Sequence, residues 1–140
     1  MRYRNQRWGF ELDLPSGWRE PGFFKRLLSF GRYAQQDVHP EFCASDGSSI
    51  KFTIGPISPV PSVEQQRSNL AAIAGRHGHD VIETGTMSVA GRNHATMQCR
   101  VPGVGVLKNY SLIFGTTEYF VTAHGDWQEC DSIVRTFKAE

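Results

Sequence analysis

The feature that most constrains the fold is the run of residues 10–18, FELDLPSGW. Apolar residues occupy every second position up to Leu14, and a strand places alternate side chains on opposite faces. Pro15 cannot donate to a sheet ladder, and the Ser-Gly pair after it favours a turn before Trp18. The run therefore predicts a strand that enters a sheet, with its acidic face in solvent, followed by a chain reversal. The buried face is expected to consist of Trp8, Phe10, Leu12 and Leu14.

The size and composition of the chain indicate one folded domain over residues 1–140. A chain of 140 residues is long enough to bury a core, and 39% hydrophobic with 21% charged residues is an ordinary globular composition. The formal net charge of +1 provides no overall attraction to nucleic acid or to an anionic membrane. We therefore expect no nucleic-acid partner, and no run approaches the roughly 18 apolar residues of a transmembrane segment.

Three cysteines, Cys43, Cys99 and Cys130, do not form the pattern of a disulfide framework. Their number is odd, no CxxC pair occurs, and each is expected to act as a small apolar residue within an element. The N-terminal sequence MRYRNQRWGF is basic like a signal peptide but lacks its apolar stretch. These features predict a reducing compartment, and we expect the protein to be cytoplasmic.

Alternation and turn residues predict six further strands. The Asp-Gly pair at 46–47 is a strong hairpin turn between two of them. In residues 94–101 the alternation is nearly complete, with Cys99 on the apolar face and His94 and Thr96 on the polar face. The predicted strands are residues 41–45, 48–54, 81–89, 94–101, 107–114 and 118–124.

Two helices are indicated by N-terminal capping patterns. Ser62 with Gln65 three residues later fits a capping box and predicts a helix over residues 62–76. Asp126 with Glu129 forms a second such pattern and predicts a C-terminal helix. Apolar residues at helical spacing indicate the face of each helix that is buried. These faces are expected to consist of Val63, Leu70, Ile73, Ala74 and His77 in the first helix, and of Trp127, Cys130, Ile133, Val134 and Phe137 in the second.

The order of these elements and three stretches of sequence resemble the PsbP/Mog1 superfamily. The stretches are FELDLPSGW at residues 10–18, SVAGRNHATMQCRV at residues 88–101, and residues 118–137, which run from EYFVTAHGDW to IVRTF. The resemblance spans nearly the whole chain and implies an α+β fold. That fold is a single-domain α/β/α sandwich with a central, mostly antiparallel sheet of about six or seven strands. Members of the superfamily are mostly non-enzymatic, so the resemblance also implies a protein without a catalytic site.

The first functional hypothesis is a non-catalytic protein-interaction module that serves as an adaptor or assembly factor. It depends on the resemblance and on a basic, aromatic segment after Trp18, which suits contact with an acidic protein partner. The alternative for this segment is a lid whose aromatic side chains close one end of the sandwich. The residues predicted to contact a partner are Phe23, Phe24, Lys25, Arg26, Leu27, Leu28 and Arg32.

The second hypothesis is a small-ligand or metal-binding protein that uses a face of the sheet or the corner of His77, His79 and Asp80. Imidazole and carboxylate groups suit zinc or another first-row ion. No cofactor is expected. A third hypothesis is an enzyme with an unrecognised site. His94 and Cys99, however, lie five positions apart in one strand, so they point to opposite faces and do not form a nucleophile–base pair.

Overall fold

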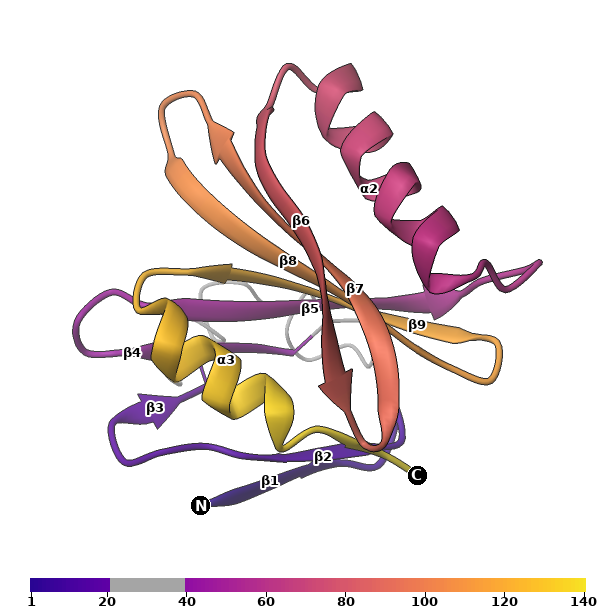
Figure 1. The fold of residues 1–140 in the computed structure, drawn as a ribbon. Coiled ribbons are helices and arrows are strands. Elements are labelled where there is room, and N and C mark those ends of the chain that lie inside the picture. Colours follow the sequence, from indigo (N-terminus) through magenta and orange to yellow (C-terminus); the bar gives the residue numbers. More distant parts are fainter. Residues whose placement is uncertain (21–39) are drawn as a thin grey trace, which may run out of the picture.

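The computed structural model describes residues 1–20 and 40–140. Their largest unit is a seven-stranded sheet in the order β3-β4-β5-β9-β8-β7-β6, in which every neighbouring pair is antiparallel (Figure 1). The six strands predicted from alternation are all present, with bounds within two residues of those expected. The strands are β3 (Trp18–Arg19), β4 (Glu41–Ala44), β5 (Ser49–Pro56), β6 (Asp80–Val89), β7 (Arg92–Val101), β8 (Gly105–Phe114) and β9 (Thr117–His124).

The strand predicted at the start of the chain lies in a separate three-stranded sheet, which we call the small sheet. Here β2 (Phe10–Asp13) pairs with β1 (Arg2–Asn5) on one side and with β10 (Lys138–Ala139) on the other. In contrast, β3 begins at Trp18 and joins the seven-stranded sheet. The predicted turn after β2 therefore carries the chain from one sheet to the other.

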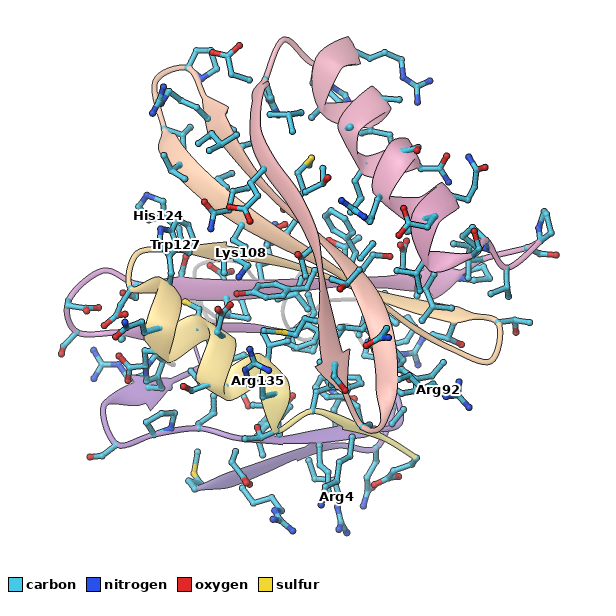
Figure 2. All side chains as sticks on the ribbon, viewed as in Figure 1. Arg4, Arg92, Lys108, His124, Trp127 and Arg135 are labelled. Carbon is cyan, nitrogen blue, oxygen red and sulfur yellow. The ribbon has the colours of Figure 1, made fainter. Side chains whose placement is uncertain are left out.

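The acidic face of β2 forms ion pairs with β1. Arg2 Nε lies 3.0 Å from Asp13 Oδ1, and Arg4 Nη2 lies 3.1 Å from Glu11 Oε2. Both arginine side chains are more than half exposed, and exposed pairs of this kind add little stability. Arg4 points away from the seven-stranded sheet (Figure 2). The face that we expected to be merely solvated thus carries the arginines of the neighbouring strand.

Two described helices cover opposite faces of the seven-stranded sheet (Figure 1). Helix α2 (Val63–Arg76) packs over β6 and β7, and α3 (Trp127–Arg135) lies on the other face with the small sheet. Both predicted caps are confirmed: the side chains of Ser62 and Asp126 accept hydrogen bonds from the backbone N–H three residues later, at 3.1 and 3.2 Å. Neither helix is long and apolar enough to cross a membrane. The predicted α+β sandwich is confirmed.

The sheet separates two clusters of buried side chains. The larger cluster lies between the sheet, α3 and the small sheet, and the Phe10 ring stacks there on Phe52 at 5.0 Å and on Phe137 at 5.3 Å. The predicted buried face of β2 is confirmed for Phe10, Leu12 and Leu14, each at most 2% exposed. The smaller cluster lies under α2 and consists of Leu70, Ala74, Ala95, Met97 and Cys99.

Two predictions about faces were wrong. His94 and Thr96 of β7 are buried, because α2 covers one face of this strand and the larger cluster lies on the other. Leu70 and Ala74 are buried as predicted, but Ile73 and His77, expected on the same face of α2, are exposed, because the face turned to the sheet runs through Gln66 instead. The buried residues of α2 are Gln66, Leu70 and Ala74.

Candidate functional site

A cavity of about 230 Å³ lies between α2 and the sheet, and we call it the α2 cavity. It forms because α2 packs mainly against β6 and β7, so that β8 and β9 continue past the side of the helix. Most of its walls are apolar. The lining residues are Leu70, Ile73, Ala74 and His77 of α2, His79 after it, Met97 and Cys99 of β7, Leu107 and Asn109 of β8, and Phe120 and Thr122 of β9.

Cys99 and Asn109 contribute neutral polar groups to the inside of the α2 cavity. Burial raises the pKa of the Cys99 thiol, against a smaller opposing effect of its hydrogen bond with Asn109. The nearby Asn109 side chain is 8% exposed, and its Nδ2 donates to Cys99 Sγ over a long 3.9 Å. Reactive cysteines have a lowered thiol pKa, so Cys99 is not an activated nucleophile. Cys99 therefore lines the cavity as a neutral, unactivated thiol.

A buried polar network fixes α2 beside the cavity. Gln66 Nε2 donates to Ser111 Oγ at 2.9 Å and to Glu118 Oε2 at 2.8 Å, and Ser111 Oγ donates to the same carboxylate oxygen at 2.6 Å. Hydrogen bonds to an ionised carboxylate are stronger than those between neutral groups. The network joins the first half of α2 to β8 and β9, and it keeps the Ser111 hydroxyl engaged with a carboxylate.

A shallower hollow continues from the α2 cavity across the sheet. It shares Leu107 and Thr122 with the cavity and extends over β5 and β4 to the turn before β8. Val104 in that turn is 56% exposed, and His124, labelled in Figure 2, lies at the end of β9 on the same side. The hollow is more polar than the cavity because Glu41, Ser49 and Lys51 also line it.

His77 and His79, predicted as metal ligands, both line the α2 cavity. Their ring centroids lie 5.8 Å apart, and Asp80 begins the adjacent strand β6. Within residues 1–20 and 40–140, no group of three or more His, Cys, Asp or Glu side chains is placed to hold a metal ion. The corner thus brings two imidazoles together, and the metal site stays a prediction.

His94 and Cys99 lie on opposite faces of β7, as their spacing predicts. Cys99 lines the α2 cavity, whereas the His94 ring packs against Phe114 at 5.0 Å on the other face. Ile113 N donates to His94 Nδ1 at 3.2 Å, so the ring proton is on Nε2, which donates to Val89 O at 3.3 Å. Burial and the charge of Arg92 lower the pKa of His94 against the effect of the Val89 bond. His94 is a neutral structural group.

The predicted partner-contact residues, from Phe23 to Arg32, lie outside the described residues. The sequence reasoning also missed two polar residues, Asn109 in the α2 cavity and Gln66 beside it. For Gln66 the signal in the sequence is a polar residue on the same helix face as Leu70 and Ala74, whereas Asn109 shares its strand face with Leu107 and the polar Ser111 and gives no such signal.

The architecture defines a PsbP/Mog1-like α+β domain. The structure is similar to cyanobacterial PsbP (CyanoP) from Synechocystis sp. PCC 6803, with a TM-score of 0.65 and 13% sequence identity over 100% of this chain and 92% of that one. It is also similar to the Ran-binding protein Mog1p of Saccharomyces cerevisiae, with a TM-score of 0.64 and 8% identity over 99% of this chain and 94% of that one. No protein-family model matches the sequence, and no curated protein is significantly similar to it. The predicted resemblance is thus confirmed in the fold.

Proposed function

We propose that the protein is a non-catalytic protein-interaction domain that acts in the cytoplasm as an adaptor or assembly factor. The observation that carries this proposal is the fold shared over nearly the whole chain with Mog1p, a Ran-binding protein. A fold does not name a partner, so the partner's chemistry is proposed from the sequence. The basic residues concentrated near the start of the chain favour a protein with an acidic surface.

The chemistry of the described residues supports a non-catalytic role. Cys99 is held as a neutral thiol, Ser111 donates to Glu118, and His94 is bonded at both ring nitrogens. Each of these groups is of a type that enzymes use as nucleophile or base, and each has a structural role here. Their engagement favours binding over catalysis.

We further propose that the partner contacts the segment after Trp18. Its alternation of aromatic, aliphatic and basic side chains suits an interface with an apolar centre and a charged rim. The proposed contact residues are Phe23, Phe24, Lys25, Arg26, Leu27, Leu28 and Arg32.

The proposal is tested by affinity capture from cells that produce the protein, followed by quantitative mass spectrometry. The baits are the wild type, Phe24→Asp, Leu28→Asp and, as a matched control, Val104→Asp, which places the same acid at an exposed apolar position in the described residues. We expect wild type and Val104→Asp to retain one specific protein that both other baits lose. Binding of that purified protein should weaken by at least about tenfold, the effect expected of an interface hot spot.

Circular dichroism must first show that all four baits are folded. Failure of the wild type to enrich any protein over a tag-only bait would contradict the proposed function. Loss of the partner by Val104→Asp, with retention by Phe24→Asp and Leu28→Asp, would instead move the contact to the hollow over β8 and β9.

A further inference from the structure

We propose that the α2 cavity binds a small neutral molecule: an apolar ring or short aliphatic chain that carries one amide, carbonyl or hydroxyl group. The inference goes beyond the proposed protein partner and does not depend on it. It rests on the size and walls of the cavity, on one amide on its wall that has a single long side-chain hydrogen bond among the described residues, and on the charge of the lining.

The size and walls of the cavity suit a small apolar body. A volume of about 230 Å³ exceeds the roughly 150 Å³ of an engineered apolar cavity that binds benzene. Leu70, Met97 and Phe120 face it from a helix and two strands, and a methionine side chain adapts readily to the shape of what it contacts. A ring with one small substituent therefore fits without rearrangement of the sheet.

Asn109 provides the polar anchor. An amide side chain offers two N–H donors and one carbonyl acceptor, and at 8% exposure this one is largely removed from solvent. Its neighbours Lys108 and Tyr110 bond Asp131 of α3 on the other face of the sheet. The one side-chain hydrogen bond that Asn109 makes to the described residues is its long contact with Cys99 Sγ. The Asn109 amide oxygen is not fully buried and lies on the cavity wall, so a ligand group that bonds the amide takes the place of water there.

The lining also selects against charged ligands. None of the described residues that line the cavity is Asp, Glu, Lys or Arg, and His77 and His79 are the only histidines among them. An ammonium group moved beside Asn109 would lose its hydration without gaining a partner of opposite charge, and no Lys or Arg among the described residues lines the cavity to pair with a carboxylate. The cavity therefore favours a neutral polar group over an ionised one.

The test uses nitrogen-15 NMR of the whole chain with benzamide and hexanamide as probes, and with benzoate and toluene as comparison compounds. We expect both amides to shift the side-chain NH₂ signal of Asn109 and the backbone signals of Met97 and Phe120, and benzoate to bind more weakly. Asn109→Leu should weaken benzamide binding by about tenfold, the loss of one hydrogen bond, and should leave toluene binding unchanged or stronger.

Ala74→Met fills the cavity from α2 and should abolish binding of both amides. Ala72→Met makes the same change at an exposed position of the same helix and should preserve it. If Ala74→Met does not fold, Ile73→Trp at the exposed rim replaces it.

Three results would overturn the proposal. The first is that neither amide moves these signals up to its solubility limit, which means that the cavity holds water only. The second is that binding survives in the filled-cavity variant, which places the probes elsewhere. The third is that Asn109→Leu binds benzamide as the wild type does.

Discussion

His94 is a buried titratable side chain whose two ring nitrogens are bonded to backbone groups of two different strands, β6 and β8. Ile113 N donates to one nitrogen, and the other donates to Val89 O. A protonated ring would have a hydrogen on both nitrogens, so the bond from Ile113 would be lost. At the scale of single residues, the fold thus depends on a particular protonation state.

Folding stability should therefore depend on pH through His94. Its pKa is near 6.5 in the unfolded chain and lower in the folded protein, mainly because of burial. Between these two values the unfolded chain binds more protons, so the contribution is fully present above about pH 6.5 and is lost as pH falls through the folded pKa. Urea unfolding of wild type and His94→Gln, at several pH values from about 5 to about 8, measures this.

Glutamine can donate and accept hydrogen bonds but does not titrate in this range. We expect the free energy of unfolding of the wild type to fall relative to that of His94→Gln below about pH 6.5. A difference between the two proteins that stays constant over the whole range would contradict the prediction.

Individual cavity residues were predictable only in part. His77 and His79 were singled out because histidines near a helix end are conspicuous, and both do line the cavity. Asn109 was not, because its role depends on its cross-strand neighbours Met97 and Thr122, which alternation within β8 does not reveal. His94 was assigned to a polar face because a single strand does not show which of its faces will be covered.

At the scale of elements, α2 owes its start to a local capping interaction. Ser62 Oγ accepts the Gln65 N–H, and Gln66 then joins the first half of the helix to β8 and β9. The cap supplies one of the hydrogen bonds that the first turn of any helix lacks.

Ser62→Ala should lower the free energy of unfolding by about 1 kcal/mol, because one backbone N–H of the first turn loses its acceptor. Ser68→Ala is the matched control, an exposed position inside the same helix where alanine is the better helix former. Urea denaturation should show a loss for the first variant and no loss for the second. Equal effects of the two changes would mean that the cap does not hold the start of α2.

Elements with strong local signals were predicted well. The helices have capping residues, the sequences of β5 and β7 alternate between apolar and polar residues, and glycine-containing turns separate β6 to β9, so these elements could be found without knowledge of the partner strand. β1 and β10 were missed because they have only four and two residues and form by pairing with β2. The division of residues 10–18 between two sheets was missed for the same reason.

At the scale of the whole molecule, one aromatic cluster holds the two sheets together. The ring centroid of Phe137 lies 5.3 Å from that of Phe10 in the small sheet. It lies 6.0 Å from that of Phe52 and 4.9 Å from that of Tyr119, both in the seven-stranded sheet. The contacts join residues from both ends and the middle of the chain. Stacked and edge-to-face aromatic pairs add to the free energy gained from burial alone.

Phe137→Ala should destabilise the protein by about 3–5 kcal/mol, because it leaves a cavity where the two sheets meet. Lys138→Ala, an exposed change one residue later in β10, should cost far less. Thermal and urea unfolding compare the two. If Phe137→Ala lowered the free energy of unfolding by less than about 1 kcal/mol, the small sheet would pack on the seven-stranded sheet without needing this ring.

The pairing of β2 with β10 has a consequence for how the protein is made. Phe10 faces Ala139 across the small sheet, so β2 lacks one of its neighbouring strands until synthesis has passed Ala139 and that residue has left the ribosome. Until then the phenylalanines of the larger cluster lack the ring of Phe137. Nascent chains that expose apolar surface and unpaired strand edges are prone to aggregate. We therefore expect emergence of β10, rather than formation of the seven-stranded sheet, to end the period in which this domain needs protection during synthesis.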